Sequence, residues 1–172
     1  MKKSTKIVSV VLMLVMAATL FAACGGGNAA DTDGGNGGSG AKGETQTWGN
    51  ITIFVPEGFT LNGGDMFDKE DPDKLTLNKD GSSYEYFMVT AGFTQDNAEM
   101  SIEGTRGANE GCEDVEIKVG DVTWKGVAYT WSSLDEVVVA APMGEGYVLF
   151  TSSGHGKDDA TFKAVLESLT VK

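Results

Sequence analysis

His155 and Cys112 are the two side chains of this sequence with the chemistry of a catalytic pair. His155 is the single histidine of the chain, and Cys112 is one of two cysteines. A thiol beside an imidazole can act as a nucleophile, because the base takes up its proton. Nothing in the sequence brings the two together, and the segment SSGHGKDD favours a hydrated loop around His155. We therefore expect no catalytic residue and no enzymatic activity.

A second group with chemical potential is a run of carboxylates that could hold a metal ion. Calcium takes six to eight oxygen ligands. The EF-hand order fails, because Leu75 stands where the third ligand would be. With one histidine in the chain, zinc is disfavoured as well. We expect a solvated loop, no bound metal and no cofactor, and keep as weak candidates the five acidic residues Asp65, Asp68, Glu70, Asp71 and Asp73.

Aromatic residues provide a third possible site. Trp48, Trp131, Tyr84 and Tyr86 could form a platform that stacks on a sugar or a peptide. Aromatic side chains on strands belong more often to the core. Ligand binding through these residues therefore stays an alternative at this point.

The N-terminal residues have the pattern of an export signal. Lys2, Lys3 and Lys6 precede an uncharged apolar run, IVSVVLMLVMAATLFAA, that ends at Ala23. The following FAAC, residues 21–24, resembles the lipobox of bacterial lipoproteins. That resemblance implies a signal peptide over residues 1–23 and a diacylglyceryl group on the Cys24 thiol. Two acyl chains suffice for stable anchoring.

A glycine-rich segment follows Cys24 and separates it from the remaining chain. Residues 25–46 contain no branched aliphatic or aromatic residue. Such a segment cannot bury enough apolar surface to offset its chain entropy, so we expect a disordered linker over residues 24–46. Residues 47–172 are then a single globular domain, which we expect to be monomeric. With 13 basic and 25 acidic residues, the net charge of −12 argues against nucleic acid as a partner.

The patterning of the globular domain predicts an α+β fold. Apolar residues alternate with polar ones in several segments, and turn residues separate them into hairpins. A stripe that includes Phe162 and Leu166 predicts a C-terminal helix packed on the sheet. We expect an antiparallel sheet of six or seven strands with flanking helices. Its strands are residues 51–55, 74–79, 84–91, 114–119, 122–131, 136–141 and 147–151, and its helices are residues 96–108, with Asp96 as N-cap, and 158–169.

The order of these segments is similar to that of PsbP-like domains. The likeness lies in FVPEGF at residues 54–59, in the hairpin VEIKVGDVTWKGVAYTW, and in a last helix that runs into SLTV. It implies an α/β/α sandwich. The group includes extrinsic subunits of the photosynthetic oxygen-evolving complex, a nuclear protein that binds the GTPase Ran, and many bacterial lipoproteins. It has no shared active site, so no functional residue carries over.

These features together predict an exported, lipid-anchored and non-catalytic binding or accessory lipoprotein of the bacterial cell envelope. We expect it on the extracytoplasmic face of the cell membrane, held there by the lipid on Cys24, with another envelope protein as partner. Two alternatives remain. One is a small cell-surface hydrolase, which would need His155 beside a nucleophile. The other is a ligand-binding module for sugar, peptide or calcium.

Overall fold

Alternating apolar residues build the strands as the sequence predicts. In the computed structural model, which describes residues 41–65 and 67–172, strand β2 (Ile51–Pro56) buries Ile51, Ile53 and Val55. The segment of residues 137–141 is buried on both faces, as its continuous apolar run predicts. The predicted signal peptide, Cys24 and most of the predicted linker lie outside the described residues.

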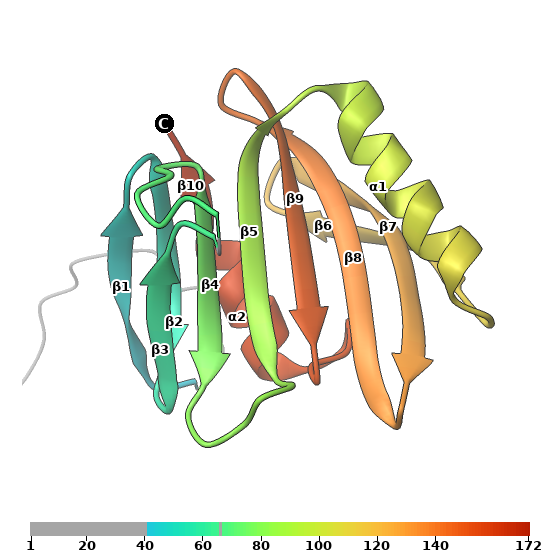
Figure 1. Ribbon diagram of the computed structural model, residues 1–172, viewed down its shortest axis with the longest axis horizontal. Helices are drawn as coiled ribbons and strands as arrows, with labels where there is room; N and C mark the ends of the chain where they lie inside the picture. Colours follow the sequence, from blue (N-terminus) through green and yellow to red (C-terminus); the bar gives the residue numbers. More distant parts are fainter. Residues whose placement is uncertain (1–40, 66) are drawn as a thin grey trace, which may run out of the picture. The chain divides into compact units, whose positions relative to one another are not determined.

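Seven strands form one antiparallel sheet in the order β3-β4-β5-β9-β8-β7-β6 (Figure 1). This confirms the predicted α+β class and the antiparallel sheet. The predicted strand at residues 51–55 lies in a separate, smaller sheet, and the seventh strand of the large sheet is instead the edge strand at residues 59–63, which was not predicted. Two-residue turns join β6 to β7, β7 to β8 and β8 to β9, longer loops join β3 to β4 and β4 to β5, and a helix follows β5. Strand β9 lies between β5 and β8. The strand bounds are β3 Phe59–Gly63, β4 Lys74–Lys79, β5 Tyr86–Phe93, β6 Glu113–Val119, β7 Val122–Trp131, β8 Leu134–Met143 and β9 Gly146–Ser153.

A smaller sheet has the order β1-β2-β10, with β1 at Gly43–Trp48 and β10 at Thr170–Val171. Strand β1 starts inside the segment predicted as linker, so the ordered domain begins at or before Gly43, not at residue 47. The reason is that β1 is an edge strand with mostly exposed side chains. It needs no apolar residues of its own, because backbone pairing with β2 holds it from Gly43 to Trp48.

Two helices cover the two faces of the large sheet (Figure 1). Helix α1 (Gln95–Ala108) packs over β7, β8 and β9. Its N-cap is Thr94, not Asp96 as predicted, because the Thr94 hydroxyl accepts from the Asn97 amide. Helix α2 (Ala160–Ser168) lies on the opposite face against β2, capped by Asp159.

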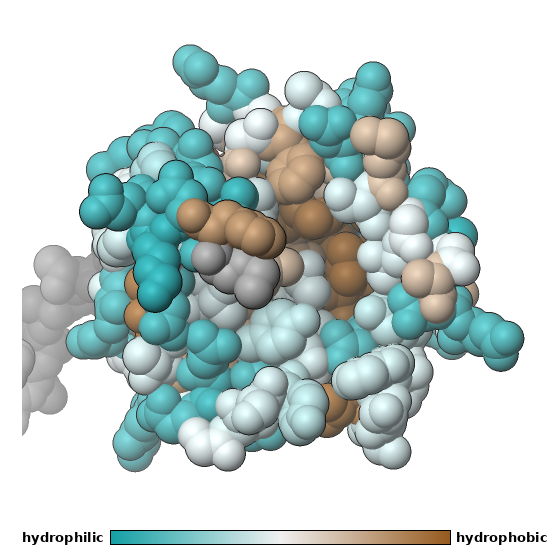
Figure 2. Space-filling view, in the orientation of Figure 1, coloured by the Kyte–Doolittle hydropathy of each residue, from teal (hydrophilic) through white to brown (hydrophobic). Residues whose placement is uncertain are grey.

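The core lies between the large sheet and the layer formed by α2 and β2. Phe162 and Leu166 of α2 are buried, as their helical spacing predicts. The Phe162 ring meets Phe150 of β9 edge to face, with a distance of 5.7 Å between ring centroids. The sheet face toward α1 is covered only in part, and Figure 2 shows a hollow in it with apolar side chains at the floor.

Candidate functional site

His155 is a buried core residue, and the expectation of a hydrated loop is wrong. Its exposed fraction is 9%, and its ring stacks on Phe87 at 5.0 Å and lies 5.7 Å from the Phe59 ring. Its Nδ1 lies 3.4 Å from a carboxylate oxygen of Asp159, and its Nε2 lies 3.7 Å from one of Glu85. Sequence reasoning failed because Phe59 and Phe87 come from distant strands that only the fold brings to this loop.

Cys112 lies away from His155. It precedes β6 at one edge of the sheet, and its Sγ is 3.5 Å from the carbonyl oxygen of Asn109 at the end of α1. His155 follows β9, and three strand steps separate β9 from β6, or roughly 14 Å across the sheet. The hydroxyl of Ser152 donates to the backbone carbonyl of His155 and not to its ring. The described residues thus give His155 no nucleophile.

The acidic loop, residues 65–73, uses its carboxylates to hold its own shape. Asp65 pairs with Lys74 at 2.7 Å and accepts hydrogen bonds from the amides of Phe67 and Asp68. Lys74 also pairs with Asp71 at 3.1 Å. The hydrogen bond from Lys74, followed by those from the two amides, lowers the pKa of Asp65 to about 2.

The other aspartates of the acidic loop are engaged in similar ways. Asp68 accepts from the Glu70 amide, Asp71 from the Asp73 amide, and Asp73 from the Asn50 side chain. Within residues 41–65 and 67–172, no group of three or more acidic, histidine or cysteine side chains is arranged to hold a metal ion.

Three of the four candidate aromatic residues meet at one place. Tyr84, Tyr86 and Trp131 line a pocket of about 360 Å³ at the lower margin of the sheet face that α1 partly covers. Trp48 lies elsewhere, because its indole N–H donates to the backbone carbonyl of Asp71 in the acidic loop.

The floor of the pocket is a row of four side chains on four adjacent strands. Tyr129 of β7 is directly opposite Glu136 of β8, Glu136 is opposite Ser153 of β9, and Ser153 is opposite Tyr86 of β5. Residues paired in this way point to the same face of a sheet. We call this set, Tyr86, Ser153, Glu136 and Tyr129, the tyrosine row.

Glu136 is the residue of the tyrosine row with unusual chemistry. Its exposed fraction is 6%, and burial raises the pKa of its carboxyl. Within the described parts of the chain, no lysine, arginine or histidine forms an ion pair with it. Burial, followed by the negative charge of Glu136, also raises the pKa values of Tyr86 and Tyr129.

The Ser153 hydroxyl links Glu136 to the pocket wall. Its Oγ lies 2.6 Å from Oε1 of Glu136 and 2.6 Å from the backbone carbonyl oxygen of Tyr84. A hydroxyl has one proton, and a carbonyl oxygen can only accept. The Ser153 hydroxyl therefore donates either to Glu136 or to the Tyr84 carbonyl. Burial, the larger effect, raises the pKa of Glu136, and the hydrogen bond from Ser153 opposes it.

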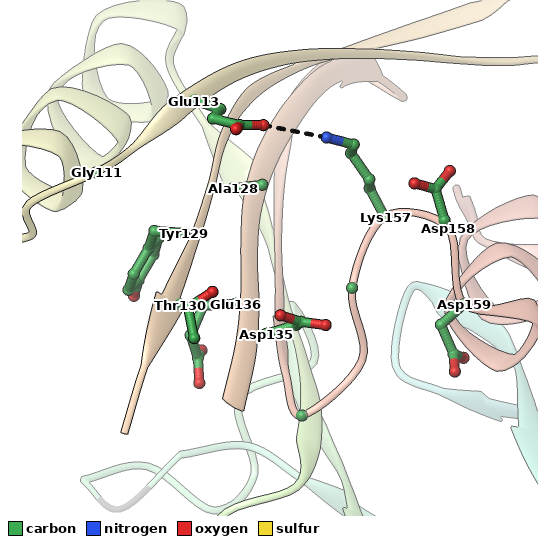
Figure 3. Close-up of a pocket in the computed structure, with 12 residues that line it drawn as sticks. Gly111, Glu113, Ala128, Tyr129, Thr130, Asp135, Glu136, Lys157, Asp158 and Asp159 are labelled. Carbon is green, nitrogen blue, oxygen red and sulfur yellow. Dashed lines mark hydrogen bonds and ion pairs between the residues drawn. The ribbon is translucent and has the colours of Figure 1, made fainter. Parts of the chain in front are cut away.

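A second pocket, of about 480 Å³, lies on the other face of the same strands (Figure 3). Asp135, Asp158 and Asp159 line it, and Lys157 pairs with Glu113 at 3.3 Å across it. In Figure 3 the Tyr129 ring points to the opposite side of β7 from Lys157. This acidic pocket adds negative potential near the tyrosine row, but its lysine is already paired.

Comparisons with known proteins leave the family open. No family model and no curated protein matches this chain. A crystal structure from Bacteroides thetaiotaomicron VPI-5482, at 1.50 Å resolution, is similar with a TM-score of 0.42 and 11% identity. The match covers 76% of this chain and 48% of that one, so this chain spans about half its length. A TM-score this low carries no argument, and the resemblance to PsbP-like domains stays a prediction.

The described residues contain no helix that is long and apolar enough to span a bilayer.

Proposed function

We propose that this chain is a lipid-anchored, non-catalytic binding protein of the bacterial cell envelope, which holds a small ligand over the tyrosine row. The observation that carries the ligand-binding part is the pocket itself. A concave site with aromatic walls and a few convergent polar groups is the usual form of a small-ligand site. Here the walls include Tyr84 and Trp131, with exposed fractions of 63% and 52%, and the polar groups are Glu136 and Ser153.

The position of His155 favours binding over hydrolysis. A hydrolase built on this histidine needs a ring nitrogen within about 3 Å of a nucleophile. Both nitrogens instead face carboxylates, those of Glu85 and Asp159, and the ring is covered by phenylalanines. Asp159 also has a structural role, because its Oδ1 caps α2 by accepting hydrogen bonds from the amides of Thr161 and Phe162.

The anchoring part of the proposal rests on the sequence. The lipobox-like FAAC places Cys24 after an apolar run, and 18 residues lie between Cys24 and the first residue of β1. Mass spectrometry of the N-terminal peptide from the native host tests it. We expect Cys24 as the first residue with a diacylglyceryl group attached. An unmodified Cys24, or cleavage elsewhere, contradicts the anchor.

Tryptophan fluorescence tests the binding part, because Trp131 is the only one of three tryptophans among the pocket-lining residues. The full-length protein in non-ionic detergent is titrated with a panel of neutral sugars, short peptides and organic amines. We expect at least one class to change the emission, the response to be lost in Trp131→Phe, and to persist in the matched variant Trp48→Phe. A panel without any response that depends on Trp131 overturns the proposal.

A further inference from the structure

The tyrosine row contains a negative group for which the described structure provides no positive partner. Burying a carboxylate is costly unless hydrogen bonds and an opposite charge compensate it. Glu136 has one hydrogen-bond partner, the Ser153 hydroxyl, and ion pairs with no basic side chain of residues 41–65 and 67–172. A fold that keeps such a group at the floor of an open pocket has a place for a positive charge brought by a ligand.

The walls of the pocket suit a cation of a particular kind. The face of an aromatic ring is negative, and it attracts ammonium groups within about 6 Å, most strongly when several rings surround them. Tyr84, Tyr86, Tyr129 and Trp131 line the pocket together with Glu136. A small hydrated metal ion needs more oxygen ligands than one carboxylate offers. An organic ammonium group satisfies both the rings and the carboxylate.

The surrounding charge favours the same class of ligand. Glu113, Asp135 and Asp158 line the acidic pocket on the other face of β7 and β8, and the whole chain has a net charge of −12. A site in a field of one sign concentrates ligands of the opposite sign. A neutral sugar gains nothing from this field, and an anionic ligand is repelled by it.

Resting on the function proposed above, we propose that the tyrosine row is a binding site for an organic cation, a protonated or quaternary amine, whose charge lies between Glu136 and the aromatic rings. Binding changes the protonation of the site. In the free protein burial raises the pKa of Glu136, and the Ser153 hydroxyl lies within hydrogen-bond distance of both Glu136 and the carbonyl oxygen of Tyr84. At a pH where Glu136 is protonated, it releases its proton to solvent when the cation enters and becomes the carboxylate that the cation pairs with.

This exchange makes the affinity depend on pH. At low pH the cation must displace the proton of Glu136, so affinity rises with pH until Glu136 is ionised in the free protein. The titratable groups that face Glu136 are Tyr86 on β5 and Tyr129 on β7, with Cys112 beside Tyr129. The raised pKa values of both tyrosines keep them neutral over the range from pH 5 to 8.

Choline and its neutral isostere 3,3-dimethylbutan-1-ol test the inference, since the two differ only in the charged nitrogen. Both are titrated into the full-length protein in non-ionic detergent at constant ionic strength, with Trp131 fluorescence as the readout. We expect choline to bind about 10-fold or more tightly than the isostere, in line with the loss of a desolvated charge pair. We also expect its Kd to fall as pH is raised from 5 to 8.

Two variants of similar chemistry locate the effect. Glu136→Gln keeps the shape of the side chain and should weaken choline about 10-fold or more. Glu113→Gln, at an exposed carboxylate, should change the Kd by less than about twofold. Equal binding of choline and the isostere, or an unchanged Kd in Glu136→Gln, overturns the inference. If sugars or peptides change the Trp131 fluorescence and amines do not, the cation site is contradicted and the proposed binding function is retained. If no class of ligand changes it, both proposals are contradicted.

Discussion

The acidic loop and the tyrosine row are two opposite uses of carboxylates in one chain. The loop has five acidic residues, and its aspartates are tied to Lys74, to Asn50 or to backbone amides. The row has a single carboxylate, Glu136, which is buried without a basic partner among the described residues. A high density of acidic residues is therefore a poor indicator of a binding site, and a buried carboxylate without a basic partner is a better one.

The pKa values separate the two regions in the same way. Hydrogen bonds from Lys74 and two amides favour the charged form of Asp65, whereas burial disfavours the charged form of Glu136. The negative charge of Asp65 therefore stabilises the acidic loop, whereas a negative charge on Glu136 destabilises the tyrosine row.

The largest difference between the two regions should appear in the free energy of unfolding when a phenylalanine ring is removed from the core beneath the sheet or from the acidic loop. Phe162→Ala deletes a ring packed on Phe150 beneath the sheet, and should cost about 3–5 kcal/mol of unfolding free energy. The matched variant Phe67→Ala removes a ring of the acidic loop that is 91% exposed, and should change stability by less than about 0.5 kcal/mol. Denaturant unfolding measures both. Comparable losses would mean that α2 is not docked or that the loop is part of the core.

The next effect concerns the charge of Glu136. Its folded-state pKa lies above the ordinary value of 4.5, so the folded protein keeps the proton longer than the unfolded chain. By linkage, stability is then lost as pH rises from 4.5 through the raised pKa. Glu136→Gln should remove this loss and be at least as stable as the native protein at pH 7. Thermal unfolding between pH 4 and 8 measures it, and a variant that is less stable at pH 7 contradicts the account.

Asp65 should show the opposite sign at lower pH. Its pKa is lowered from 3.8 to about 2, so its contribution to stability is present above pH 3.8 and is lost as pH falls toward 2. Lys74→Met removes the hydrogen bond that lowers the Asp65 pKa most, and should move acid unfolding to higher pH. Asp68→Asn serves as the control, because Asp68 has no basic partner in the described structure. Acid titration followed by circular dichroism decides it, and an unmoved midpoint in Lys74→Met contradicts the assignment.

The smallest effect should be that of calcium. A ligand that binds only the folded state raises the unfolding free energy by RT ln(1 + [L]/Kd). Because the aspartates of the acidic loop already accept internal hydrogen bonds, we expect millimolar Ca²⁺ to leave Tm unchanged within error. A rise in Tm that chelator reverses, and that Asp65→Asn abolishes, would return the loop to the list of candidate sites.

Local patterns were enough to predict most of the fold. Alternation predicted β2, β4 and β6, and the apolar stripe predicted α2, because one buried face is recorded in consecutive residues. Strands β1, β3 and β10 were missed because each lies at the edge of its sheet. Their side chains are exposed or half-buried, so pairing with a single neighbouring strand leaves little apolar pattern to detect.

The site was less predictable, since its residues come together across strands. Tyr84, Tyr86 and Trp131 were found as aromatic candidates by residue type. The pairing of Tyr129 with Glu136 could have been predicted, because the two-residue turn at Ser132 and Ser133 fixes the register of β7 and β8. The other half of the row could not, because β5 and β9 pair over a long stretch of chain that carries no local signal.

Carbon-13 NMR of the Glu136 carboxyl tests whether this buried carboxylate binds the cation. In protein labelled at the glutamate carboxyl carbon, with Glu136→Gln used to assign the resonance, the pH titration is recorded with and without choline. We expect a midpoint above the ordinary 4.5 in the free protein, and a shift of that midpoint to lower pH when choline is added. A midpoint at or below 4.5, or one that choline does not move, would contradict it.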